Sequence, residues 1–340
     1  MMRALGENKQ VKGSVLFAVK LLISVGVLAF LLRRVDVHAL EEHILAVNPV
    51  MFGAAVLLLA AQVVVLSRRW LQVMRVTGGT ISELEAWRIT MISLWFGLVL
   101  PSSAGSDAVR IWLLKRQDIS WGAAVKGVLA DRLTALIALV FMIAVGYPFL
   151  VMRTDNHPAL LAIGALAAAG AAGTVVLCTL DKWPKRITNL KPVAALAEFG
   201  ELLRLVMFRK PGRKRILGLA VLIHLTTVMV CVVLAMGIKA ELTMADAFLL
   251  IPPVILLSAF PISISGWGVR EGAMVAGLGL IGMASEKALT ISLLLGLASS
   301  LIGVLGGLVW LFSLDRKALS PDDLNRAMED ALPTTQVQKS

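Results

Sequence analysis

Two segments of the chain combine a proline with an arginine inside very apolar sequence. The first reads LPSSAGSDAVR and runs from Leu100 to Arg110; the second reads FPISISGWGVR and runs from Phe260 to Arg270. Proline ends a helix because it lacks a backbone donor, and the following Ser and Gly residues let the backbone turn tightly. A helix that restarts there places its positive dipole end beside a guanidinium group. This combination favours an anion, above all a phosphate.

Acidic residues accompany both arginines, because Asp107 and Glu271 are close to them in the sequence. These acids could pair with the arginines in the empty state or carry protons. Under the alternative interpretation, each arginine only pairs with its acid or extends to the membrane interface. The predicted substrate-binding residues are Ser103, Asp107, Arg110, Asp131, Arg132, Ser263, Gly266, Gly268, Arg270 and Glu271.

The composition identifies the environment of these residues. Of 340 residues, 58% are hydrophobic and only 16% are charged, which is too little charge to cover the surface of a soluble domain. A bilayer core about 30 Å thick needs about 20 residues of helix, and several apolar runs reach that length. We therefore predict an all-α polytopic membrane protein.

The apolar runs divide into full spans and shorter pieces. The predicted full spans are 14–32, 50–67, 124–152, 159–180, 216–236 and 288–313. In 89–116 and 247–284 the apolar run reaches a proline after only 12 and 14 residues, which is typical of re-entrant or broken helical hairpins. The fold prediction is therefore about six full spans plus two such hairpins.

The order of the elements suggests an inverted repeat, with units of about 50–152 and 216–313. In transporters with this architecture the substrate site lies where the broken segments meet. We therefore expect Arg110 and Arg270 to hold one headgroup between the hairpins. Asp131 and Arg132 lie inside the membrane if their span starts at 124, or at its boundary if the span starts at 132.

The net charge of +11 is concentrated in one loop, 181–215, which has ten Lys/Arg against three Asp/Glu. Basic loops mark the cytoplasmic side and meet anionic lipid, so we expect no nucleic-acid partner and cytoplasmic N- and C-termini in a bacterial-type inner membrane. The loop contains an amphipathic stretch, with Leu196, Phe199 and Leu203 opposite acidic residues. It predicts a helix lying on the interface or, alternatively, packed on its own protein. Residues 1–313 then form one membrane domain, and 314–340 a polar cytoplasmic tail.

Other motifs are weaker. Cys178 and Cys231 are expected to be small buried side chains, and His224 either packs in the core or lines a cavity. Gly303 and Gly307 form a G-x-x-x-G pattern that predicts a close helix contact. The chain has no H-E-x-x-H, P-loop or G-x-S-x-G motif, so we expect no catalytic residue, no metal and no cofactor.

With these residues in view, the chain resembles the flippase-like transmembrane family of lysylphosphatidylglycerol synthases, the membrane half of the multiple peptide resistance factor. Three matches carry the resemblance, which covers about residues 14–313. LPSSAGSDAVRIWLLKR is similar to the first family motif, and ADRLTALIAL to the acid–Arg pair that opens a span. The segment from Pro261 to Gly272 contains every fixed letter of P-x-S-x-x-G-x-G-x-R-E-G.

The resemblance implies lipid handling: binding and transbilayer translocation of a phosphate-bearing anionic or lipid-linked substrate, with a membrane lipid as partner. The chain ends 27 residues after its last predicted span, so we expect no aminoacyl transferase domain and transport rather than catalysis. The alternatives are a membrane enzyme, with Asp131 or Glu271 as general base, and an accessory subunit that binds a protein partner through the basic loop. Either would serve an aminoacyl-lipid, hopanoid or lipid-linked sugar pathway.

Overall fold

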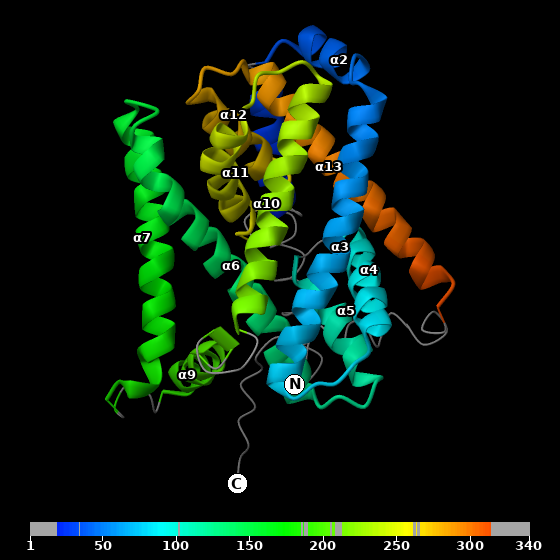
Figure 1. The fold of residues 1–340 in the computed structure, drawn as a ribbon, viewed down its shortest axis with the longest axis vertical. Coiled ribbons are helices and arrows are strands. Elements are labelled where there is room, and N and C mark those ends of the chain that lie inside the picture. The colour runs from blue at the N-terminus through cyan, green and yellow to red at the C-terminus, as the bar shows by residue number, and fades with distance from the viewer. Residues whose placement is uncertain are drawn as a thin grey trace, which may run out of the picture.

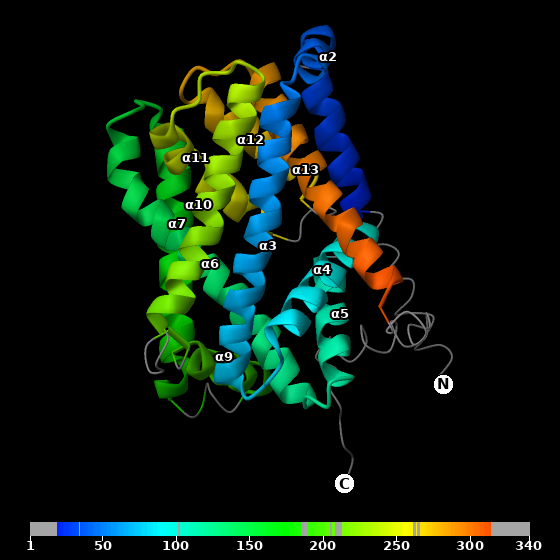
Figure 2. The ribbon, with the colours of Figure 1, turned by 45° about the vertical axis from the view of Figure 1, so that its right-hand side comes forward.

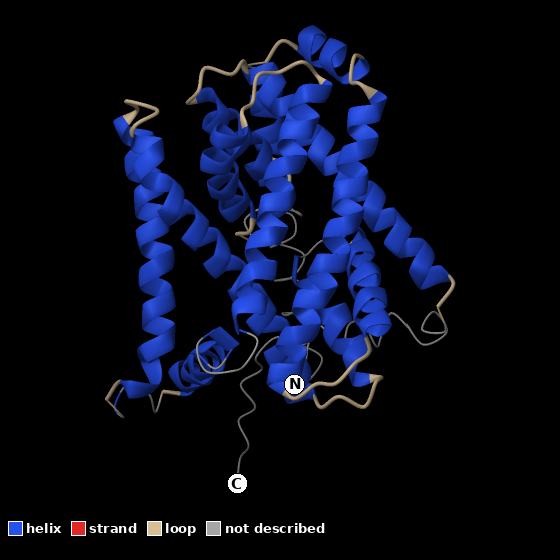
Figure 3. Ribbon diagram, in the orientation of Figure 1, coloured by secondary structure: helices blue, strands red, loops and turns tan. Residues whose placement is uncertain are grey.

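The long apolar runs form long helices in the computed structural model. It describes residues 19–33, 35–100, 103–184, 186, 190–204, 206–207, 213–260, 263 and 266–313, and the polar tail 314–340 lies outside them. The described helices are Val19–Leu32, α2 Val37–Leu45, α3 Pro49–Thr77, α4 Glu83–Val99, α5 Ser103–Lys115, α6 Trp121–Val151, α7 His157–Thr179, η1 Leu180–Lys182, α9 Lys191–Arg204, α10 Arg213–Gly237, α11 Met244–Ser258, α12 Val269–Gly279 and α13 Ser285–Leu311. No strand occurs among these residues (Figure 3).

Five helices in the described part are long and apolar enough to cross a bilayer: α3, α6, α7, α10 and α13. They correspond to five of the six predicted spans. Of the first predicted span, residues 14–18 lie outside the described residues and the remainder forms the apolar helix Val19–Leu32. The prediction of an all-α polytopic membrane protein is confirmed.

Capping residues decide where the long helices begin and end. The Asn48 side chain accepts hydrogen bonds from the first turn of α3, directly before Pro49, and Gly78 ends this helix with a φ of 92°. The Ser120 hydroxyl caps α6 in the same way. α3 continues to its cap at Gly78, and α6 begins directly after its cap at Ser120, so both helices extend beyond their apolar runs into polar sequence.

The two broken segments each form a pair of packed helices. α4 packs against α5, and α11 packs against α12. In both ribbon views α4 and α5 occupy the half of the molecule near α9, whereas α11 and α12 occupy the half near α2 (Figures 1 and 2). The two hairpins thus belong to opposite ends of the helix bundle, as an inverted repeat requires. Pro101 and Pro261 lie outside the described residues.

α10 connects the two halves, because it packs along α3 and also contacts α6, α11 and α13. The Gln62 side chain of α3 donates to the Ile223 carbonyl at 2.6 Å and to the Thr227 hydroxyl at 2.8 Å. The largest apolar cluster of the described residues includes Cys231 of α10 and residues of the helices that pack around it. These contacts make α10 the central element of the fold.

Glycines of α13 allow α4 to approach closely. A Cβ atom added at Gly303 or Gly307 would collide with the side chains of Leu98 and Trp95, and one at Gly306 with the Met91 carbonyl. The close helix contact predicted from the G-x-x-x-G pattern is therefore confirmed, with Gly306 as its tightest point.

Gly306→Ala tests this contact. Alanine normally favours a helix over glycine by about 1 kcal/mol, so a loss of stability would come from the collision with a backbone oxygen that cannot rotate away. We expect a destabilisation of about 1–3 kcal/mol, measured as a lower thermal midpoint in one detergent. In the matched control Gly53→Ala, the added atom meets nothing within 4 Å. Equal midpoints for the two variants would contradict the contact.

Candidate functional site

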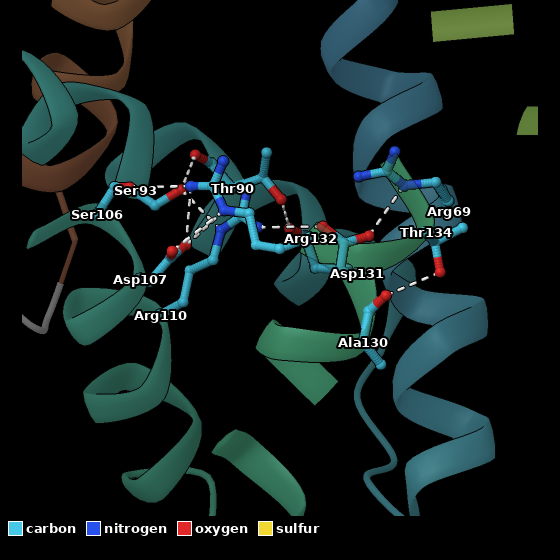
Figure 4. Close-up of polar contacts among 11 residues, drawn as sticks. Arg69, Thr90, Ser93, Ser106, Asp107, Arg110, Ala130, Asp131, Arg132 and Thr134 are labelled. Atoms are coloured by element: carbon cyan, nitrogen blue, oxygen red, sulfur yellow. Dashed lines mark hydrogen bonds and ion pairs between the residues drawn. The ribbon is translucent and has the colours of Figure 1, made fainter. Parts of the chain in front are cut away.

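The first charged cluster lies in the half of the bundle near α9 and joins three elements. Arg69 of α3 donates through Nε to Asp131 Oδ1 of α6 at 2.9 Å, and Arg110 Nη1 of α5 lies 3.4 Å from Asp131 Oδ2. The side chains of Arg69, Arg110 and Asp131 are 4%, 6% and 2% exposed. Figure 4 shows the two arginines approaching the carboxylate from two sides.

Neighbouring side chains fix the orientation of Arg110. Its Nε donates to the Ser93 hydroxyl of α4 at 3.0 Å, and Ser93 in turn donates to the Thr90 carbonyl at 2.7 Å. The guanidinium also lies over the Trp70 ring, 5.2 Å from its centre, a cation–π contact that a dry site strengthens. Arg110 is therefore held by α3, α4 and α6 together.

The cluster has an excess of positive charge and an unused donor. Two guanidinium groups face one carboxylate, and Arg69 Nη1 is buried without a hydrogen-bond partner among the described residues. A buried cation without a counter-charge destabilises a folded protein by on the order of several kcal/mol. An oppositely charged partner would relieve this destabilisation. The arrangement can accept an anionic oxygen atom as its missing partner.

Asp107 and Arg132 form a separate, more exposed pair between α5 and α6. Both Asp107 oxygens accept from Arg132 Nε at 3.1 Å, and Oδ1 also accepts from Nη2 at 2.9 Å. The Arg132 side chain is 50% exposed. The sequence suggested that Asp107 could pair with Arg110; the structure pairs it with Arg132, because that guanidinium presents two donors to one carboxylate while Arg110 reaches the buried Asp131.

The second cluster lies on α12 and α13 in the other half of the bundle. Glu271 is fully buried; its Oε1 accepts from Arg270 Nη2 at 2.6 Å and from the Ser292 hydroxyl at 3.1 Å. Its Oε2 accepts from the Gly268 backbone N–H at 2.6 Å. Arg270 also lies over the Trp267 ring at 4.9 Å. This cluster contains one cation and one carboxylate, so its charge is balanced.

Glycines shape the backbone before α12. Gly266 and Gly268 have φ values of 80° and 86°, which glycine adopts without strain. Gly268 also lies against the Ser24 carbonyl of the first helix, and Gly296 of α13 leaves room for the Arg270 guanidinium. Ser263 is buried, and its hydroxyl has no partner among the described residues.

The two clusters lie on different hairpins, one in each half of the bundle (Figure 1). Arg110 and Arg270 share no partner among the contacts of the described residues, and the expectation that they hold one headgroup together stays a prediction. α10 packs against α3 and α6, which carry Arg69 and Asp131, and against α13, which carries Ser292. The His224 ring nitrogen contacts the Ala135 carbonyl at 3.0 Å, so this side chain is satisfied within the core.

Several residues of these clusters were not predicted from sequence. The predicted span 50–67 stops two residues before Arg69, whereas α3 continues to Thr77. Ser93 and Ser292 carry no local signal, since serine is common in apolar helices. The backbone of Ser103 begins α5, but its side chain lies outside the described residues.

This fold and these clusters define a class of protein: a polytopic α-helical membrane protein with a buried arginine–carboxylate cluster on each of two helical hairpins. The family described as lysylphosphatidylglycerol synthase TM region matches residues 17–307, and the chain belongs to this family. It is therefore a membrane protein tied to lipid metabolism or translocation. No curated protein matches the chain.

We expect the substitution of aspartate by asparagine to have different effects at positions 131 and 107. Asp131→Asn removes the carboxylate that faces two buried arginines, so we expect a destabilisation of about 3–5 kcal/mol. Asp107→Asn weakens a pair whose arginine is half exposed, and its effect should be about 0–1 kcal/mol. Thermal unfolding of both variants in one detergent gives the comparison. An equal loss in the two variants would contradict the assigned roles.

Proposed function

We propose that the protein binds the phosphate-bearing headgroup of an anionic lipid or of a lipid-linked substrate and moves it across the bilayer. The observation that carries the proposal is the cluster of Arg69, Arg110 and Asp131, with two buried guanidinium groups, one carboxylate and an open donor at Arg69 Nη1. Phosphate oxygens suit such a site, since arginine binds them with paired, charge-assisted hydrogen bonds.

The second cluster supplies the next binding position on the path. Arg270 is on α12, in the hairpin that belongs to the opposite end of the bundle (Figure 1). A headgroup that leaves Arg110 would meet Arg270, which Glu271 neutralises while the position is empty. Two successive positions keep the roles of both arginines.

The contacts of the carboxylates favour binding over catalysis. Glu271 accepts from Arg270, Ser292 and the Gly268 N–H, and Asp131 accepts from two arginines. A general base needs a free lone pair directed at its substrate, whereas the oxygens of both carboxylates already accept hydrogen bonds from the protein. Asp131 and Glu271 are therefore assigned to charge balance.

The orientation follows from the distribution of charge. α9, from the basic 181–215 loop, and the basic segment 68–88 lie at the same end of the bundle (Figure 2). Lys and Arg concentrate on the cytoplasmic side of membrane proteins. We place the α9 end in the cytoplasm of a bacterial-type inner membrane, so that the first cluster is the one nearer the cytoplasmic leaflet.

Arg110→Ala and Arg270→Ala test the mechanism in vesicles that contain the purified chain. We expect each variant to slow the transbilayer movement of a fluorescent phosphatidylglycerol at least tenfold, or about 1.4 kcal/mol, because each removes one phosphate position. Dithionite quenching of the outer leaflet measures the rate. Arg68→Ala, at an ion pair with Glu83 in which both side chains are exposed, is the matched control and should keep the wild-type rate. Wild-type rates in both cluster variants would exclude this mechanism.

A deletion strain separates transport from the enzyme and accessory-subunit alternatives. Transport predicts an unchanged set of lipids whose distribution between the leaflets has shifted. Mass spectrometry of the total lipid extract, combined with labelling of the outer leaflet, measures both quantities. The loss of one lipid species from the extract would instead indicate a role in its synthesis.

A further inference from the structure

A cavity of about 420 Å³ lies between α6 and α7, and its wall on α6 begins at Leu133, two residues after Asp131. Its walls come from α6, α7, the end of α11 and one residue of α9. Thr174 is the polar residue among the wall residues, and its hydroxyl already donates to the Gly170 carbonyl at 2.8 Å. The cavity therefore offers apolar surface and no free hydrogen-bonding group from its side chains. Its volume falls in the range of roughly 300–1,000 Å³ typical of ligand sites.

The divergence of two helices creates this space. α6 and α7 meet at their connecting loop and separate toward the other end, where α9 lies across the opening (Figure 1). α7 is rich in Ala and Gly, so its side chains do not fill the space. A Cβ added at Gly170 would collide with Val140, whereas one added at Gly173 would meet nothing within 4 Å. Gly170 thus sets the close approach, and Gly173 faces open space.

α9 is fixed across the opening by polar contacts. Arg204 donates to Asp181 Oδ1 and Oδ2 at 2.8 and 2.6 Å and to the Cys178 carbonyl at 2.9 Å. The hydrogen bond with Asp181 raises the pKa of the Arg204 guanidinium, so it stays charged. Gly200 lies directly against the Leu177 carbonyl, and the neighbouring Leu203 is almost fully buried and lines the cavity. The amphipathic helix thus packs on its own protein and closes one end of the space.

The wall on α6 continues from a charged residue. Leu133, Leu136, Ile137 and Val140 have the spacing of one helix face, and Leu136 and Val140 follow Arg132 at four-residue intervals. Arg132 pairs with Asp107, yet its side chain is half exposed, so its guanidinium remains accessible to a second anionic group. A guanidinium group at the end of an apolar groove complements a molecule with an anionic group at the end of a hydrocarbon chain.

We propose that this cavity binds one acyl chain of a membrane phospholipid, whose phosphate lies at Arg132 before it enters the first cluster. The proposal rests on the proposed lipid-binding function and adds where the hydrocarbon part of the substrate is held. The acyl chain follows the α6 face from Arg132 toward Val140, and α9 separates it from the aqueous side. The lipid then approaches the bundle between α6 and α7.

Photo-crosslinking tests the occupant. The full chain is placed in vesicles of phosphatidylcholine and phosphatidylglycerol, with a trace of phosphatidylglycerol that carries a diazirine on one acyl chain. After illumination, peptide mass spectrometry locates the adducts. We expect adducts in 133–140 and 166–177 at several times the level found on the lipid-facing side of α10. Equal labelling of all lipid-facing helices would overturn the proposal, since it would describe bulk lipid.

Gly173→Leu is the decisive variant, because it fills the cavity without a collision at its Cβ and exchanges glycine for a better helix former. We expect it to lower the adducts in the cavity at least fivefold. Gly218→Leu, at a glycine of α10 that also faces open space, is the matched control and should leave them unchanged. Unchanged adducts in Gly173→Leu would overturn the proposal.

Two further cross-linking experiments test which part of the lipid the site recognises. Arg132→Gln should reduce adducts from the diazirine phosphatidylglycerol severalfold and leave those from a diazirine alkane unchanged; an equal effect on both probes would overturn the role of Arg132. If the alkane labels the wild-type cavity as well as the phospholipid does, the site takes any hydrocarbon and the proposal fails. Cavity adducts in a wild-type protein that moves no lipid would support this site while refuting transport.

Discussion

One carboxylate, Asp131, determines how the α9 half of the molecule is assembled. Burying three ionised groups in a membrane protein is strongly unfavourable unless each finds a partner, and here the partners come from different helices. Arg69 brings α3 to α6, and Arg110 brings α5 to the same point. The hairpin of α4 and α5 therefore has one favourable position, in which the guanidinium of Arg110 reaches both Asp131 and Ser93. Because the pairing leaves one positive charge unmatched, the contact that positions the hairpin also creates a place for an anion.

The two hairpins differ in how far their buried arginines are neutralised. In the second hairpin Glu271 closes its own turn by accepting from the Gly268 N–H, in addition to neutralising Arg270. That cluster is complete without a ligand, whereas the first is not. A substrate that moves between them would be attracted at Arg110 by unmatched charge. At Arg270 it would compete with an existing carboxylate, so its hold there would be weaker and its release easier.

The sequence predicts the helices better than it predicts the contacts among their side chains. Uncharged runs of about 20 residues identify spans because the bilayer imposes that length, and both hairpins follow from their prolines. Charge limited the same reasoning: the predicted span 50–67 stops before Arg68 and Arg69, although a partner of Arg69 on another helix allows α3 to continue past both. The exchange of partners between Asp107 and Asp131 was equally inaccessible. Asp107 is three residues from Arg110 and 25 from Arg132, and only the positions of α5 and α6 decide which pair forms.

α6 brings these features together because consecutive residues of a helix point about 100° apart. Asp131 faces α3 and α5, Arg132 turns to Asp107, and Leu133 opens the apolar wall toward α7. Three neighbouring positions thus meet a buried charged cluster, a half-exposed ion pair and an apolar cavity. In the proposed function these are the surroundings of the phosphate and of the acyl chain of one lipid. A rotation of α6 by one residue would change the surroundings of Asp131, Arg132 and Leu133 together. The contact between Asp131 and Arg69, which fixes the rotation of α6, therefore also fixes the position of the cavity wall relative to the charged cluster.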